Sequence, residues 1–246
     1  MARRRFLVEQ IRDNTAELRG EDARHLARVL RAEPGQQYEI SDGASACLAE
    51  ITAVERDRVV FRVVEPIETP PAAVRLTLCA ALIKFDRFEW LVEKATELDV
   101  AAIVPVNAAR SEKGLLEAAR KRTERWLRIA HESSQQSRRL APPEIAEPQP
   151  LAAAITVSGR YRYFLDEKPG ARPLLSVLPP PAARRNSDSA VLLTGPEGGW
   201  TDSERAAALA AAWTPASLAP RILRAETAAI AAAGILSHAW WASQLE

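Results

Sequence analysis

The sequence has no apolar run long enough to cross a membrane, and it contains only two cysteines among 246 residues. A spanning helix needs about 20 consecutive apolar residues, so we expect no membrane segment. Charge returns at Glu9 before any apolar segment of the signal type develops, which predicts a cytoplasmic protein. Cys47 and Cys79 lie in strand-like stretches with no Cys or His at metal-ligand spacing. We therefore expect them to be small buried hydrophobic residues.

The sequence also lacks a strong excess of charge, since the formal net charge is +1 at pH 7. This value argues against a uniformly basic nucleic-acid binder. Basic residues are nevertheless concentrated between Arg110 and Arg139, and again at Arg3–Arg5. Such runs are typical of a solvated helix face with ion pairs, and equally of a stripe that faces RNA phosphates. The pattern leaves both interpretations open.

Strand and hairpin signals dominate the chain to about residue 68. A hairpin turn is indicated at Asp42-Gly43, because glycine tolerates the positive φ that such turns require. One helix is predicted from Glu21 to Arg31, with Pro34-Gly35 ending it. The predicted strand segments are Phe6–Val8, Tyr38–Ser41, Cys47–Ile51 and Val59–Val64. We expect a small β-rich barrel or sheet domain, followed by a linker rich in proline.

From Val74 onward strands and helices alternate, which predicts a largely parallel sheet covered by helices. The predicted strands are Val74–Ala81, Ala101–Val106, Tyr161–Leu165 and Ala190–Thr194. The predicted helices are Asp86–Leu98, Leu115–Ser137, a segment from the capping box Thr201–Glu204 toward Trp213, and Glu226–Ser243. The proline-rich stretch around Pro173–Pro181 is interpreted as a loop. Trp240 and Trp241 fit core packing or a homodimer contact equally well.

The clearest local signal is Leu192-Leu-Thr-Gly-Pro-Glu-Gly-Gly-Trp200, where a predicted strand runs into a glycine-rich turn and a capped helix. Open α/β sheets bind ligands at the carboxyl edge of their strands, and glycines there let a cofactor lie against the main chain. Taken alone, these glycines are also ordinary turn residues. Their spacing matches neither a phosphate loop nor the dinucleotide fingerprint.

A second segment, Ser217–Ala228, places Arg221, Arg224 and Glu226 where a short apolar stretch breaks into a helix. On their own the arginines fit solvated surface residues, and Glu226 fits the amino end of a helix dipole. The two segments together resemble the family of ribosomal RNA uridine-N3 methyltransferases, within the SPOUT superfamily of knotted methyltransferases. The order Gly-Pro-Glu-Gly-Gly, then Ile-Leu-Arg-Ala-Glu-Thr-Ala, is highly specific. Further matches extend over nearly the whole chain: the Arg-Arg-Phe opening, His25–Arg31, Lys84 through Leu98, Arg110-Ser111, Arg125-Trp126, Ile129-Ala130 and Gln136–Arg139.

The resemblance implies an α/β protein with an amino-terminal PUA-like β-barrel RNA-binding domain at residues 1–70. It implies a carboxyl-terminal SPOUT α/β methyltransferase domain at residues 71–246, tied in a deep trefoil knot. It further implies a homodimer with the cofactor pocket near the subunit interface. The implied cofactor is S-adenosylmethionine, with S-adenosylhomocysteine as product. The implied substrate is small-subunit ribosomal RNA or the assembled 30S subunit.

The resemblance also implies which residues form the sites. The cofactor-binding residues are expected to be Leu193, Thr194, Gly195, Pro196, Glu197, Gly199, Leu218, Arg221, Ile222, Leu223, Thr227 and Ala228. The RNA-binding residues are expected to be Arg3, Arg4, Arg5, His25, Arg28, Arg31, Lys84 and Arg139. Three positions depart from the family pattern: Ala219-Pro220 and Asp99 stand where glycine is usual, and Ala109 stands where an acid is usual.

Methylation at N3 of uracil requires loss of the N3 proton, so the enzyme must stabilise an anion. Arginine forks can hold the two carbonyl oxygens that share the charge, and the candidates are Arg221, Arg224 and Arg110. Glu226 is interpreted as a base or as a residue that holds an arginine in place. The methyl donor is already activated, and the histidines show no ligand spacing, so we expect no metal.

Two other functions fit the same sequence. One is an RNA-binding ribosome-assembly factor with a degenerate methyltransferase domain, for which Ala219-Pro220 is the best support. The other is methylation of a ribose or of a different base, which keeps the cofactor and changes the nucleophile.

Overall fold

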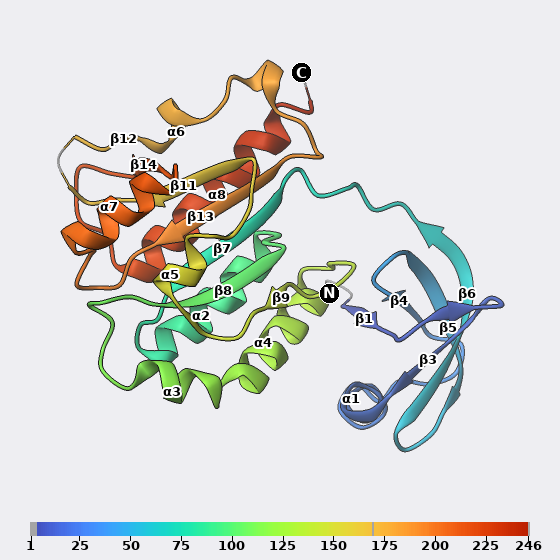
Figure 1. The fold of residues 1–246 in the computed structure, drawn as a ribbon. Helices are drawn as coiled ribbons and strands as arrows, with labels where there is room; N and C mark the ends of the chain where they lie inside the picture. Colours follow the sequence, from blue (N-terminus) through green and yellow to red (C-terminus); the bar gives the residue numbers. More distant parts are fainter. Residues whose placement is uncertain (1–3, 169, 246) are drawn as a thin grey trace. The chain divides into compact units, whose positions relative to one another are not determined.

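The computed structural model describes residues 4–168 and 170–245 (Figure 1). The chain divides into two compact units. The first contains Met1–Pro70 together with His131–Pro142, and the second contains Pro71–Ala130 together with Pro143–Glu246. The segment His131–Pro142 therefore packs with the first unit, although the sequence predicts it within the second domain. Each unit is described by itself.

The first unit is a six-stranded sheet with one helix, α1 (Gly20–Arg28). Its strands are β1 (Arg5–Leu7), β2 (Ile11–Arg12), β3 (Thr15–Arg19), β4 (Gln37–Ser41), β5 (Ala46–Val54) and β6 (Arg58–Ile67). The strand order is β1-β4-β5-β6-β3-β2, with β1 parallel to β4 and the other pairs antiparallel. No pairing joins β1 to β2 within the described residues, so a closed barrel is not observed.

The predicted turn at Asp42-Gly43 is confirmed, since it joins antiparallel β4 and β5 and Gly43 has φ +88°. The Asp42 carboxylate accepts hydrogen bonds from the main-chain N–H groups of Ala44 and Ser45. The core of this unit is apolar, and α1 contributes Ala23 and Leu26 to it. The helix is buried on one face because these residues lie three apart.

The second unit is built on an eight-stranded parallel sheet. Its strands are β7 (Arg75–Ala81), β8 (Ala102–Asn107), β9 (Glu144–Ile145), β10 (Gln149–Pro150), β11 (Tyr161–Leu165), β12 (Arg172–Pro173), β13 (Ser189–Thr194) and β14 (Thr214–Ser217). The strand order is β10-β8-β7-β13-β11-β14-β12, and β9 pairs with β8. The predicted strands and the parallel sheet are thus confirmed.

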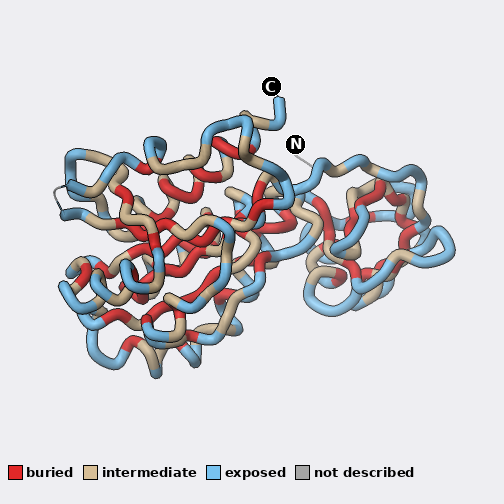
Figure 2. Tube along the Cα trace, turned by 45° about the horizontal axis from the view of Figure 1, so that its top comes forward, coloured by how far each residue is buried: buried red, intermediate tan, exposed pale blue. Residues whose placement is uncertain are grey.

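Helices cover both faces of this sheet. They are α2 (Phe85–Glu97), α3 (Leu115–Arg120), α4 (Thr123–Gln136), α5 (Leu151–Ala154), α6 (Leu174–Val177), a 3₁₀ turn (Pro181–Ala183), α7 (Asp202–Ala210) and α8 (Ala225–Ala242). Along β7, Leu76 and Leu78 belong to the core that includes α2 and α8, whereas Cys79 and Ala81 belong to the opposite core. This alternation buries the strand on both sides. Figure 2 shows the buried residues, in red, concentrated in the interior of each unit.

Several details differ from the sequence prediction, which also lacks the strands β2, β3, β9, β10 and β12. The helix predicted over Leu115–Ser137 is two helices, broken where Arg122 lies over the Phe85 ring and pairs with Glu89 of α2. These contacts come from a distant segment, so the local pattern could not indicate the break. The proline-rich stretch contains α6 and the 3₁₀ turn. Strand β14 was missed because it is short and includes Pro215, a residue uncommon inside sheets.

The burial predictions for single side chains are largely confirmed. Both cysteines are free and buried, and burial raises the pKa of the Cys79 thiol to about 12. Trp240 is fully buried and its indole N–H donates to the Asp188 carboxylate, whereas Trp241 is 52% exposed. No helix among the described residues combines the length and the apolar character needed to span a bilayer.

Candidate functional site

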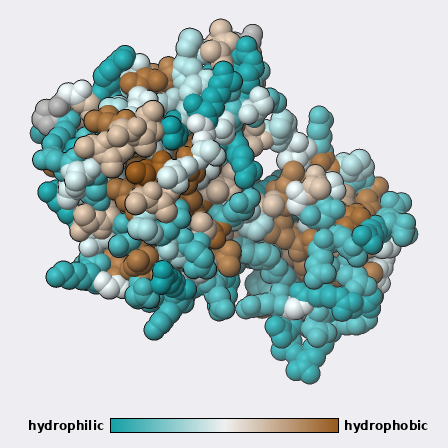
Figure 3. All heavy atoms as spheres, viewed as in Figure 1, coloured by the Kyte–Doolittle hydropathy of each residue, from teal (hydrophilic) through white to brown (hydrophobic). Residues whose placement is uncertain are grey.

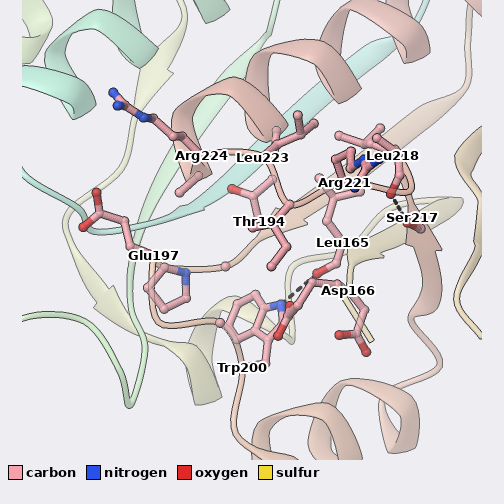
Figure 4. A pocket seen from close by; sticks show the side chains of 18 of the residues that line it. Leu165, Asp166, Thr194, Glu197, Trp200, Ser217, Leu218, Arg221, Leu223 and Arg224 are labelled. Atoms are coloured by element: carbon pink, nitrogen blue, oxygen red, sulfur yellow. Dashed lines mark hydrogen bonds between the residues drawn. The ribbon is translucent and has the colours of Figure 1, made fainter. Parts of the chain in front are cut away.

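A cavity of about 560 Å³ opens at the carboxyl edge of β11, β13 and β14 (Figure 4). Because the three strands are parallel, the loops that follow them meet at this edge. The lining residues come from these loops and from the start of α8: Leu165–Glu167, Thr194–Trp200, Ala216–Ala225 and Ala228. The volume lies within the range of about 300–1,000 Å³ that is usual for small-molecule sites.

The loop after β13 carries no side chain where it approaches Trp200. A Cβ atom on Gly195 would lie 3.0 Å from two atoms of the Trp200 ring, which is too close for an ordinary contact. Trp200 is 1% exposed, and its indole N–H donates to the main-chain oxygen of Leu165 at 2.8 Å. Gly199 has φ +65° and donates its N–H to the oxygen of Pro196. Glycine is therefore required here for space and for backbone conformation.

Two arginines hold this loop by its carbonyl oxygens. Arg110 donates to the oxygens of Gly198 at 2.9 Å and Trp200 at 3.3 Å. Arg205 of α7 donates to the oxygen of Trp200 at 2.6 Å and pairs with Asp166 and Glu167 at the end of β11. Burial opposes the charge of Arg205, but the hydrogen bond to Asp166 and the negative charges of Asp166, Glu167 and Asp202 together outweigh it and raise the pKa of the guanidinium. The loop is thereby tied to two neighbouring segments of the sheet edge.

The loop after β14 presents free main-chain groups. Within the described residues, the N–H groups of residues 219 and 221–223 make no hydrogen bond, and Pro220 has none to offer. Arg221 and Arg224 are exposed and have no ion pair within the described chain. Ile222 is 89% exposed. Figure 4 shows Leu218 and Leu223 beside the cavity, with Arg224 extending away from Thr194. Unpaired amides and free cations at one opening favour an anionic or polar ligand.

A third arginine connects the two loops. Arg87 of α2 forms a short ion pair with Glu197, and its Nε lies 3.8 Å from Oε1 of Glu226. Glu226 is 6% exposed, and its Oε2 has no hydrogen-bond partner within the described chain. A buried carboxylate with a single cationic neighbour is uncommon outside functional sites.

Known proteins resemble this chain over most of its length. A family model described as RNA methyltransferase domain matches residues 70–237, and a model described as RNA methyltransferase PUA domain matches residues 18–64. The chain belongs to this RNA methyltransferase family. Ribosomal RNA small subunit methyltransferase E of Bacillus subtilis is 30% identical over 91% of this chain and 90% of its own length. The same enzyme of Synechocystis is 34% identical over 89% of this chain and 72% of its own length.

Solved structures of the family share the fold. The enzyme of the same name from Neisseria gonorrhoeae, bound to S-adenosylmethionine, has a TM-score of 0.84 and 28% identity over 96% of this chain and 97% of that one. A Legionella pneumophila methyltransferase, also in complex with that cofactor, has a TM-score of 0.84 and 27% identity over 97% and 98%. The resemblance drawn from the sequence is confirmed at the level of the family.

Most residues expected at the methyltransferase cofactor site line the cavity. They are Thr194, Gly195, Pro196, Glu197, Gly199, Leu218, Arg221, Ile222, Leu223 and Ala228, together with the candidate catalytic residue Arg224. Leu193 is buried in β13, and Thr227 lies in the first turn of α8 outside the lining. Glu226 and Arg110 also lie outside the lining, and both contact the site through other residues.

Several lining residues were missed by sequence reasoning, notably Asp166, Glu167, Trp200 and Ser217. The signal for the first two was available, because they directly follow the predicted strand Tyr161–Leu165 and must lie at the carboxyl edge of a parallel sheet.

The residues expected to bind RNA are distributed over both units. Arg28, Arg31 and Lys84 are exposed, His25 and Arg139 are partly exposed, and Arg3 lies outside the described residues. Arg4 is exposed at the start of the described chain. Arg5 is instead 4% exposed, because its guanidinium pairs with Glu39 and donates to the oxygen of Arg138. Arg139 donates its Nε to the oxygen of Ala141.

Proposed function

We propose that this chain is an S-adenosylmethionine-dependent methyltransferase that methylates N3 of a uridine in small-subunit ribosomal RNA. The observation that carries the proposal is the single cavity shared by the loops after β13 and β14, which contain both motifs of the family resemblance. The relatives named ribosomal RNA small subunit methyltransferase E, and the homologous structure bound to S-adenosylmethionine, support it.

The residues at the cavity fit such a donor. Glycines at 195 and 199 let Trp200 and Glu167 pack closely against the loop that lines the cavity, and free amides at 221–223 can hold polar groups of the donor. Leu218 and Leu223 provide apolar contact. When bound, S-adenosylmethionine supplies an electrophilic methyl on a sulfonium. We assign cofactor binding to the residues already expected from the sequence, with Leu193 and Thr227 supporting the loops from outside the lining.

The chain's own residues would stabilise the uracil anion. Arg221 and Arg224 are exposed at the cavity and carry no competing ion pair in the described chain, so their guanidinium groups are available for the two carbonyl oxygens. Arg110 has a different task, because it already donates to the oxygens of Gly198 and Trp200. Glu226 supplies a carboxylate in the first turn of α8, directly after the loop that carries Arg221 and Arg224.

We also propose the domain roles and the finer fold. Residues 1–70 form a PUA-like β-barrel that binds RNA, and residues 71–246 form a SPOUT domain with a trefoil knot. The path of the carboxyl terminus supports the knot, since α8 packs on β7 and β13 although β14, just before it, lies beyond β11. RNA contacts are assigned to Arg4, His25, Arg28, Arg31, Lys84 and Arg139, whose side chains are at least partly exposed.

A homodimer is proposed for the active form. Hydrophobic residues interrupt the hydrophilic surface of the second unit in Figure 3. Among the large apolar side chains, Ile222, Trp241 and Trp90 are 89%, 52% and 44% exposed. Exposed large apolar side chains that gather into a contiguous patch are typical of association surfaces. Sedimentation velocity should therefore give twice the monomer mass of 27.0 kDa.

The deciding experiment is transfer of a labelled methyl from S-adenosylmethionine to small-subunit ribosomal RNA, followed by mass identification of the methylated atom. Label at N3 of uridine is expected. Label on ribose or on another base would show that the nucleophile is not N3 of uridine. If the protein binds the cofactor but transfers no methyl to free RNA or to the assembled subunit, a ribosome-assembly factor is favoured instead.

A further inference from the structure

Arg87 lies between two carboxylates that belong to the two loops of the cavity. Glu197 belongs to the glycine-rich loop after β13, and Glu226 follows the loop after β14. Arg87 forms a short ion pair with the first and approaches the second at 3.8 Å. It comes from α2, which is distant from both loops in the sequence. One side chain thus bridges the segments that carry the two family motifs.

The position of Arg87 is not explained by the stability of its helix. It is the third residue of α2, and a cation near a helix amino terminus is disfavoured by the helix dipole. The side chain is 30% exposed, so its ion pair with Glu197 is only partly screened by solvent. The ion pairs within the site therefore oppose the unfavourable effect of the helix dipole.

Glu226 depends on this arginine. Its carboxylate is 6% exposed, and an ionised carboxylate in such surroundings requires a nearby positive charge. Within the described residues, Arg87 is the cation that forms an ion pair with it. Because Oε2 has no hydrogen-bond partner there, no second contact fixes the orientation of the carboxylate. Removing Arg87 would leave Glu226 buried without its cationic neighbour and without a contact that fixes its orientation.

We infer that Arg87 is a positioning residue for methyl transfer, which keeps the glycine-rich loop and the start of α8 in register and orients Glu226. This inference rests on the proposed function of the same cavity. It predicts that Arg87 influences donor binding and turnover although it does not line the cavity.

The test compares Arg87→Gln, Arg87→Lys, Glu226→Gln and the double variant Arg87→Gln/Glu226→Gln. The matched control is Arg75→Gln, which breaks an exposed ion pair with Glu144 at the opposite, amino-terminal end of β7. Binding of S-adenosylhomocysteine is measured by calorimetry, hydrogen exchange is followed in residues 195–200 and 222–228, and kcat and KM are measured with RNA.

For Arg87→Gln we expect affinity to fall about 10-fold and kcat to fall by up to about 100-fold, with faster exchange in both loops, because small misplacements at a reacting centre are costly. Arg87→Lys should recover most of the affinity, since it keeps the charge, but less of kcat, since it lacks the fork. The double variant should be no worse than Arg87→Gln, because the arginine acts through the carboxylate.

Two results would overturn the inference. One is an Arg87→Gln protein that binds and exchanges like the Arg75→Gln control. The other is full additivity of Arg87→Gln and Glu226→Gln in kcat. Should Arg87→Gln fail to fold, the Arg87→Lys protein still decides, because unchanged kcat, affinity and exchange there refute a bridging role. If the wild type transfers no methyl, the proposed function is refuted. The hydrogen-exchange comparison then still tests whether Arg87 holds the two loops together.

Discussion

Replacing Gly199 by alanine tests the geometry of the glycine-rich loop most directly. Gly199 has φ +65°, a conformation that alanine adopts only at a cost. An added Cβ would also lie 2.5 Å from Oε1 of Glu167, so that carboxylate must move. Its movement breaks the 2.6 Å ion pair with Arg205, which holds the end of β11 beside the loop.

The magnitude follows from these two contributions. The left-handed backbone costs an alanine roughly 1–2 kcal/mol. Displacing Glu167, whose side chain is 43% exposed, adds about 0.2–1 kcal/mol, the usual range for an ion pair near solvent. The sum is about 2 kcal/mol, equivalent to roughly 30-fold in an equilibrium constant. If the loop keeps its conformation, the free energy of unfolding falls by this amount; if the loop relaxes, donor affinity falls instead.

The assay therefore measures both quantities, by urea unfolding and by calorimetry with S-adenosylmethionine. Gly114→Ala is the matched control, because Gly114 has φ +82° with no atom within 4 Å of the added Cβ, and it lies outside the cavity. The control should lose about 1 kcal/mol of stability and keep its donor affinity. Adding Glu167→Ala to Gly199→Ala removes the steric conflict but also the ion pair with Arg205, so the double variant should stay about as destabilised as Gly199→Ala. A Gly199→Ala protein that unfolds and binds like the wild type would refute this reasoning.

Two further predictions concern stability. Ala212 follows α7, is exposed and has φ +58°, so Ala212→Gly should raise the free energy of unfolding by about 0.5–1 kcal/mol. Ala206→Gly, within α7, should lower it by a similar amount. Urea midpoints that move in the same direction for both variants would contradict this prediction. In the first unit, the hydrogen bond to Asp22 at 2.6 Å raises the pKa of His131 above 6.5 against the opposing effect of burial. The protonated form is favoured by folding, so this stabilisation is complete below pH 6.5 and is lost as pH rises through the folded-state pKa. Unfolding free energies measured across that range should decline in the wild type and lack this component in His131→Gln; identical pH dependence in both proteins would disprove it.

Much of the second unit was predictable because its strands and helices have clear local periodicity. The strand Tyr161–Leu165 was predicted with its observed bounds, and the capping box at Thr201 is formed by both of its hydrogen bonds. The break between α3 and α4 was not predictable, since it involves contacts of Arg122 with α2. Local patterns indicate elements well, but they carry no information on contacts between distant segments.

The candidate site divides in the same way. Each of the two cavity motifs is a continuous stretch of sequence, so its glycines and arginines could be identified before the fold was known. The residues that hold these loops are not contiguous with them. Arg87 precedes Glu197 by more than 100 residues in the sequence, yet the two side chains are hydrogen-bonded. Arg110 likewise donates to the oxygen of Gly198 from a distant position in the sequence. Their role could be seen only once the chain was folded.

This division has a physical cause in the glycines themselves. A loop rich in glycine can approach a ligand with its main chain, but it loses more conformational entropy on ordering than other loops and has few side chains with which to anchor itself. The anchoring must therefore come from other elements, and here three arginines provide it: Arg87 through Glu197, and Arg110 and Arg205 through carbonyl oxygens. A planar guanidinium suits this task because it can donate to two acceptors at once. The freedom that makes the loop a binding surface thus requires distant charges to fix its shape.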